Sequence, residues 1–166
     1  MRGALAGALA AGVWAIQQPL DKRVFGSSYD DVELLGKAIT RGPEWPLAGT
    51  ALHIQNGAAF GALYAQLKPF IPGPPVVRGA AAGLAEHVAL WPLVRVVDRL
   101  HPARDQLDPL GGDWRAFAQA TWRHLLFGAV LGAVEDRLNA DQDIDVPPIP
   151  ASSNGHGSIE AAVGAA

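Results

Sequence analysis

The chain contains no cysteine and little charge. Without cysteine it can form no disulfide, no thiolate metal site and no cysteine nucleophile. Charged residues make up 17% of the 166 residues, whereas about 25% is usual for a soluble domain. The 13 Lys and Arg are scattered and the net charge is −3, so the chain offers no basic surface for nucleic acid.

Motifs of the common catalytic classes are also missing. The chain has no Gly-x4-Gly-Lys phosphate loop, no Gly-x-Gly-x-x-Gly after a strand, no Gly-x-Ser-x-Gly elbow and no His-Glu-x-x-His. No nucleophile is paired with an orienting base in a recognisable pattern. We therefore expect that the protein is not an enzyme.

What the chain does contain is four long apolar segments, separated by charged or Pro/Gly-rich turns. They cover residues 3–16, 47–67, 79–94 and 116–134. Residues 47–67 carry no formal charge and, at about 1.5 Å per residue, would cross the roughly 30 Å core of a bilayer. The pattern predicts an all-α protein, a four-helix transmembrane bundle. A soluble Ala-rich bundle is the alternative, and residues 3–16 also fit the apolar part of a secretory signal.

A repeated motif organises the chain. Residues 50–62 and 121–133 share the frame Thr-x2-His-x3-Gly-Ala-x2-Gly-Ala, which aligns His53 with His124. A polar residue recurring at a fixed offset indicates duplication. We therefore predict one membrane domain, residues 1–139, made of two tandem helical hairpins (about 2–68 and 78–138). Residues 140–166, rich in Asp, Pro, Ser and Gly, are predicted to be a disordered tail.

All four segments carry two glycines spaced by four. The pairs are Gly3/Gly7, Gly57/Gly61, Gly79/Gly83 and Gly128/Gly132. Small residues at this spacing let helix backbones approach closely in lipid, whereas in water each glycine would cost about 1 kcal/mol relative to Ala. The glycines thus favour the membrane interpretation.

The connecting segments suggest an orientation. Ser28-x-x-Asp31 resembles a capping box ahead of an amphipathic stretch, which predicts a short interfacial helix over 28–41. Loops 21–46 and 95–115 hold eight Lys and Arg and the opposite side holds four. The positive-inside rule then places both loops in the cytoplasm and makes the protein a multi-pass protein of the cell membrane. Trp14 is predicted to anchor a helix at the membrane interface.

Polar side chains inside or at the ends of the segments form the candidate site. Intramembrane ionisable groups usually face the bundle interior, so we predict one polar cluster built from both repeats. His53 and His124 are both expected about 10 Å deep from the same side. Glu86 and Arg123 are expected about 10 Å apart in depth, so that Arg123 could instead snorkel to the surface. The predicted members are Gln17, Gln18, Asp21, His53, Asn56, Glu86, His87, Arg95, Asp98, Arg123 and His124.

Three functions remain open for this cluster. The two histidines could be titratable groups of a proton-linked or small-solute pathway. They could instead hydrogen-bond neighbouring helices in a packing or scaffold protein with no transported species. A haem or metal held by both is the third alternative, although no His-x3-His or Glu-x-x-His spacing supports it, and no other cofactor is predicted.

Five phrases carry a family resemblance: QPLDKRVFG, SYDDVELLGK, LHIQNGAAFGALYA, AEHVALWPLVRVVDRLHP and FAQATWRHLLFG. Together, over about residues 2–138, they resemble an uncharacterised family of small bacterial multi-helix proteins of the membrane. The resemblance implies no activity and no catalytic residue. The expected partners are the lipid bilayer and further copies of the chain, and nucleic acid is not expected.

Overall fold

The computed structural model describes residues 1–140, and its regular elements there are all helices, which confirms the all-α prediction. Three 3-10 turns, Lys68–Phe70, Trp91–Leu93 and Arg104–Gln106, lie between the longer helices. The predicted tail, apart from its first residue, lies outside the described residues. The α-helices are α1 (Arg2–Phe25), α2 (Asp31–Ile39), α3 (Trp45–Leu67), α4 (Pro75–Leu90), α5 (Val94–Leu100) and α6 (Trp114–Asn139).

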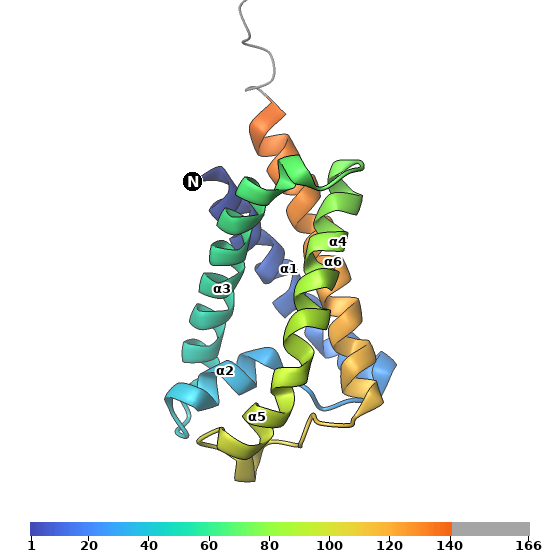
Figure 1. Ribbon diagram of the computed structural model, residues 1–166. Coiled ribbons are helices and arrows are strands. Elements are labelled where there is room, and N and C mark those ends of the chain that lie inside the picture. The colour runs from blue at the N-terminus through green and yellow to red at the C-terminus, as the bar shows by residue number, and fades with distance from the viewer. Residues whose placement is uncertain (141–166) are drawn as a thin grey trace, which may run out of the picture.

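Four long helices form the body of the protein, and the short α2 and α5 lie at one end of it (Figure 1). Helix α1 packs against both α3 and α6, α4 packs against α6, and α2 packs against α3. Helices α3 and α4 make no comparable contact with each other. The bundle is therefore open between α3 and α4, with α1 and α6 behind the opening (Figure 1).

Two helix boundaries differ from the prediction. Helix α1 continues through Pro19 to Phe25 and ends at Gly26, whose φ of 60° suits a glycine at a helix C-terminus. The third predicted segment, 79–94, contains a break: α4 ends at Leu90, and a 3-10 turn that includes Pro92 leads into α5. A proline has no N–H to donate, so each interrupts the hydrogen-bond ladder locally; the α-helix ends before Pro92, whereas α1 continues past Pro19.

The predicted capping box is wrong. Helix α2 begins at Asp31, and Asp30 is its N-cap, with a carboxylate oxygen that accepts from the Glu33 N–H at 2.9 Å. Ser28 instead donates its hydroxyl to Asp108 at 2.6 Å. Asp and Ser are equally good N-caps, so the local pattern could not rank them.

The spaced glycines lie where the long helices approach most closely. A Cβ on Gly7 of α1 would be 2.0 Å from the carbonyl oxygen of Gly57 on α3. A Cβ on Gly79 of α4 would be 2.0 Å from the carbonyl oxygen of Gly128 on α6. The α1–α3 and α4–α6 pairs thus share one packing device. The origin of the two pairs by duplication stays a prediction.

Polar and apolar side chains are distributed unusually between the inside and the outside. Arg123 and Gln119 are fully buried, whereas Leu5 and Ile16 on α1 are 51% and 82% exposed. Within the described residues, one stretch, Pro75–Leu100, is long and apolar enough to cross a membrane by length and composition, with a mean hydropathy of 1.3. The glutamines, histidines and arginine of the other long helices lower their hydropathy. The four-span prediction is thus not confirmed.

Candidate functional site

Seven of the eleven predicted polar residues fall into two adjacent groups, together with residues that were not predicted. The first, here called the Arg123 network, comprises Arg123, Asp21, Asp31, Tyr29, Gln119 and Gln17. The second lines a cavity that includes His53, Asn56, Glu86 and His124. One indole, that of Trp14, contacts both groups.

Arg123 joins three helices by a buried ion-pair arrangement. Its Nε and Nη2 each donate to a different oxygen of Asp21 at 2.6 Å, and its Nη1 donates to Oδ2 of Asp31 at 2.8 Å. The Arg123 side chain is 0% exposed and that of Asp21 is 2% exposed. Two carboxylates from α1 and α2 therefore neutralise one guanidinium from α6. Arg123 does not snorkel to solvent, because these partners satisfy it inside the protein.

The remaining members complete the hydrogen bonding of the network. Gln119 donates to Asp21 at 2.6 Å, and the Tyr29 carbonyl accepts from Arg123 at 3.1 Å. The Tyr29 hydroxyl donates to Asp31, and the Arg123 guanidinium lies 5.3 Å from the centre of the Tyr29 ring. Such pairing is what a buried charge requires in order to be tolerated.

Tyr29 of the network and the neighbouring Asp30 have shifted pKa values. Burial, reinforced by the Asp31 carboxylate, raises the pKa of Tyr29 well above its ordinary value. Burial also disfavours the charged form of Asp30, but hydrogen bonds from Lys22 and from the Glu33 N–H outweigh it and lower the pKa of Asp30 overall. At neutral pH the phenol is therefore protonated, and Asp30 is ionised.

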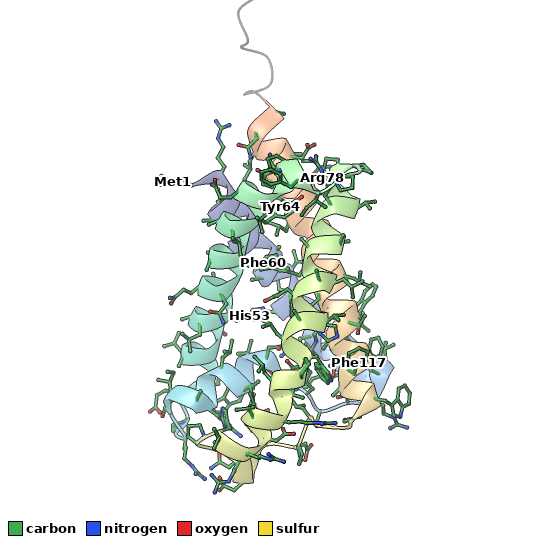
Figure 2. The ribbon with its side chains drawn as sticks, viewed as in Figure 1. Met1, His53, Phe60, Tyr64, Arg78 and Phe117 are labelled. Carbon is green, nitrogen blue, oxygen red and sulfur yellow. The ribbon has the colours of Figure 1, made fainter. Side chains whose placement is uncertain are left out.

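The second group surrounds a cavity of about 180 Å³ between α3 and α4. His53 and Asn56 of α3 face Glu86 of α4 and His124 of α6 across it. Figure 2 shows His53 on the side of α3 toward the opening. Further lining residues come from α1 (Ala11, Trp14), α2 (Asp31, Leu34, Leu35), α3 (Gly57, Phe60) and α6 (Phe127).

Trp14 connects the two groups, a role that sequence reasoning missed. It is 6% exposed, so it is not the predicted interfacial anchor. Its ring lies edge-on to His53 and to His124, with centroid distances of 5.1 and 4.8 Å. Its Nε1 donates to Asp31 at 3.1 Å. The two sequence-matched imidazoles therefore share Trp14 as their common contact.

The cavity contains ring nitrogens with unused hydrogen-bonding capacity. The His53 Nε2 is buried and has no hydrogen-bond partner. The Nδ1 of His124 lies 2.7 Å from the Ala120 carbonyl oxygen, so Nδ1 must donate. Its Nε2 then faces Glu86 Oε2 at 3.6 Å, and in the neutral tautomer both atoms are acceptors. A direct bond between them requires a proton from outside the pair.

His87 and the two glutamines of α1 do not line the cavity. His87 is 2% exposed, lies 2.9 Å from the Thr121 hydroxyl, and stacks on His124 with ring centres 4.8 Å apart. Gln17 belongs to the Arg123 network and also accepts from the Trp122 Nε1 at 3.2 Å. Gln18 is buried, and its Oε1 has no partner.

Arg95 and Asp98 join neither group, contrary to the prediction. Both lie on α5, beyond the break after α4. Asp98 accepts from the backbone N–H groups of Leu110 and Gly111 at 2.9 and 2.7 Å, and thus holds the following loop, while Arg95 is exposed. Helix α5 follows α4 beyond the turn that contains Pro92, at the end of the bundle that carries α2 (Figure 1), so these residues lie outside the part of the bundle where Asp21 meets Arg123.

The geometry does not favour a cofactor between the two matched histidines. Within residues 1–140, no group of three His, Asp or Glu has an arrangement that could hold a metal ion. A haem bound by His53 and His124 would have to displace Trp14, which contacts both. Comparisons with protein-family models, with curated proteins and with solved structures give no match for this chain. This agrees with a resemblance to an uncharacterised family, and it transfers no activity to the site.

Proposed function

We propose that the protein is a small integral membrane protein whose four long helices cross the bilayer as two tandem hairpins. The observation that carries this proposal is the inverted distribution of polarity. The charged Arg123 and Asp21 are buried in the bundle, and large apolar side chains cover its outside. In water this arrangement would forgo most of the hydrophobic stabilisation of folding, whereas in lipid it satisfies both sets of side chains.

The outer face of α1 shows the pattern most clearly. Its exposed apolar side chains run from one end of the helix to the other, which at about 1.5 Å per residue is close to the 30 Å of a hydrocarbon core. Each is at least 39% exposed. These residues are Leu5, Leu9, Val13, Ile16, Leu20 and Val24.

The glycine contacts support the same proposal. Helix association in lipid gains little from hydrophobic burial and depends on close backbone packing. The contacts of Gly7 with Gly57, and of Gly79 with Gly128, are of this kind. The excess of Lys and Arg in loops 21–46 and 95–115 supports a cytoplasmic location for the end that carries α2 and α5.

We further propose that the cavity is the functional centre, a binding position on a proton-linked or small-solute pathway. Four titratable side chains face it: Asp31, His53, Glu86 and His124. Asp31 is committed to Arg123, whereas His53 Nε2 has no partner and Glu86 faces His124 without a hydrogen bond. Unpaired ionisable groups inside a bundle usually mark ligand or proton sites, because leaving them unpaired destabilises the fold.

A scaffold protein with no transported species is the second candidate. The observation that favours it is the Arg123 network, in which all three guanidinium nitrogens donate within the protein and the side chain is buried away from any ligand. In this alternative the cavity is a packing defect.

The membrane proposal is tested by carbonate extraction of the membranes of expressing cells. Retention of the chain in the pellet supports an integral protein. Release of a folded, monodisperse chain without detergent would overturn the proposal.

The cavity proposal is tested with the purified protein in liposomes that hold a pH-sensitive dye. Proton flux that depends on the protein and falls several-fold in His53→Ala and His124→Ala would support a pathway. Glu44→Gln serves as control, because Glu44 is exposed and lies outside the cavity wall. Absent wild-type flux, with the two cavity variants only less stable, would favour the scaffold function.

A further inference from the structure

The cavity wall combines acidic and aromatic side chains with two histidines, His53 and His124, and contains no Lys or Arg among the described residues. Its carboxylates are Asp31 and Glu86, and its aromatic rings are Trp14, Phe60 and Phe127. Aromatic faces attract cations through their quadrupole, and more strongly where water is excluded. A wall of this composition suits a positively charged ligand and repels a phosphate or a carboxylate.

The two carboxylates are not equivalent. The charge of Asp31 is neutralised by Arg123 at 2.8 Å, and its oxygens also accept from Trp14 and Tyr29. Glu86 has His124 as its one ionic neighbour within the described residues, at 3.6 Å, and its side chain is 32% exposed. Glu86 is therefore the group whose charge a bound cation would balance.

The size of the cavity limits the ligand. A cavity of about 180 Å³ slightly exceeds the roughly 150 Å³ that holds a benzene molecule in an apolar protein site. The aromatic pair Phe60 and Phe127, with ring centres 5.6 Å apart, borders the cavity from α3 and α6, and Asp31, Leu34 and Leu35 border it from α2. A ligand of about six to eight non-hydrogen atoms fits this volume.

The unpartnered ring nitrogen of His53 favours a ligand that carries a hydrogen-bonding group. The His53 side chain lines the cavity, and its Nε2 lies beneath the surface without a hydrogen-bond partner among the described residues. A buried polar atom left in this state costs about 1–3 kcal/mol, and a rotation of the ring that brings Nε2 to a ligand hydroxyl would satisfy it. Asn56, on the same wall, offers both a donor and an acceptor.

We infer that the cavity binds a small organic cation of the substituted-ammonium class, one that also carries a hydroxyl group. The ammonium lies against Glu86 and the aromatic rings, and the hydroxyl bonds His53. This inference rests on the proposed function, because it names the solute for the cavity proposed there as a binding position.

Choline and its uncharged carbon isostere, 3,3-dimethylbutan-1-ol, are the probes that test the charge requirement. Both are titrated calorimetrically into the purified protein in lipid nanodiscs, with empty nanodiscs as the blank. We expect saturable binding of choline and at least tenfold weaker binding of the isostere, because only choline can pair with Glu86. Equal binding of the two, or no choline binding at millimolar concentrations, overturns the inference.

Two variants test the residues. Glu86→Gln should lower the affinity for choline at least tenfold and leave the affinity for the isostere unchanged. Phe60→Leu should lower the affinity for choline about threefold, because the cation–π contact is lost. Glu44→Gln is the matched control, because Glu44 is exposed and lies outside the cavity wall. Choline affinity that is unchanged in a folded Glu86→Gln protein overturns the assignment of Glu86.

The failures of the two proposals can be told apart. A chain released by carbonate extraction overturns the membrane proposal, whatever it binds. A chain that stays in the pellet and binds phosphocholine more tightly than choline overturns the organic-cation inference alone, and points to recognition of a lipid headgroup.

Discussion

The Arg123 network and the cavity lie side by side and share Trp14 and Asp31, yet they treat polar atoms in opposite ways. In the network, each nitrogen of the Arg123 guanidinium group donates to an acceptor on α1 or α2 or in the loop between them, with four hydrogen bonds in all. In the cavity, the His53 Nε2 has no partner and Glu86 lies 3.6 Å from His124. The two groups also differ in exposure: the Arg123 and Asp21 side chains are 0% and 2% exposed, whereas Asn56 is exposed and the Glu86 side chain is 32% exposed. The His53 Nε2 is nevertheless buried, so exposure alone does not explain the difference.

The difference separates structure from function within one polar interior. A fully paired buried charge fixes helix positions and is costly to disturb. An unpaired group contributes nothing to stability and is retained where a ligand or a proton completes it. We therefore expect substitutions in the network to lower stability and substitutions in the cavity to lower binding or flux.

The largest effect is expected for Arg123→Met. Without the guanidinium, the buried Asp21 carboxylate keeps the hydrogen bonds from Gln17 and Gln119 but has no counter-charge, and removal of one partner of a buried ion pair costs about 3–5 kcal/mol. The free energy of unfolding, measured by denaturant titration in mixed micelles, should fall by this amount. The double variant Asp21→Asn, Arg123→Met should recover part of the loss. A single variant within about 1 kcal/mol of wild type would contradict the structural role of the network.

A smaller effect is expected for Gly7→Ala, which acts on the cavity wall and leaves the network in place. The new Cβ would meet the Gly57 carbonyl at 2.0 Å, and Gly57 lines the cavity. Overpacking of this kind lowers the unfolding free energy by about 1–3 kcal/mol, and it should also weaken the binding of choline. Gly12→Ala on the same helix is the control, since nothing lies within 4 Å of a Cβ there. Similar unfolding free energies for the two variants would contradict the close α1–α3 contact.

The long helices were predictable because their signals are local. Apolar length identified α1, α3, α4 and α6, and the spacing of four identified Gly7 and Gly57 as packing positions before any contact was known. The break after α4 was missed because Pro92 was counted as part of a continuous apolar run.

The division of the polar residues into two groups could not be predicted from the sequence. Arg123 and Asp21 are 102 positions apart, and Asp31 reaches them only because α2 packs against α3 beneath the cavity. Trp14 was interpreted as an interfacial anchor because its sequence neighbours place it near a helix end. Its burial depends on α1 lying between α3 and α6, which is a tertiary fact.

A matched pair of histidine variants sharpens the contrast further. His53→Leu removes a ring nitrogen that has no partner, so the unfolding free energy should stay the same or rise by about 1 kcal/mol. His87→Leu breaks the contact with the Thr121 hydroxyl and should lower the unfolding free energy by about 1 kcal/mol. Choline binding should fall in the first variant and persist in the second. Choline binding that persists in His53→Leu and falls in His87→Leu would show that His53 has a packing role only.

The smallest effect is expected for an ion pair at the edge of the bundle, Lys22 with Asp30 at 2.7 Å, where both side chains reach solvent. The pKa of Asp30 is lowered in the folded protein, so its ionised form stabilises the fold. That contribution is complete above the ordinary pKa of 3.8 and is lost as the pH falls through the lower folded value.

Asp30→Asn retains the N-cap and removes the charge, so it isolates the ion pair from the cap. The wild type should lose more stability than Asp30→Asn between pH 5 and pH 3 (the range about the ordinary pKa), by a few tenths to about 1 kcal/mol. Unfolding curves of the two proteins across this range measure the difference. Water screens the partly exposed Lys22–Asp30 pair but not the buried Arg123–Asp21 pair. If the loss of the Asp30 charge lowered the unfolding free energy as much as Arg123→Met does, burial would not be what makes the Arg123 network strong.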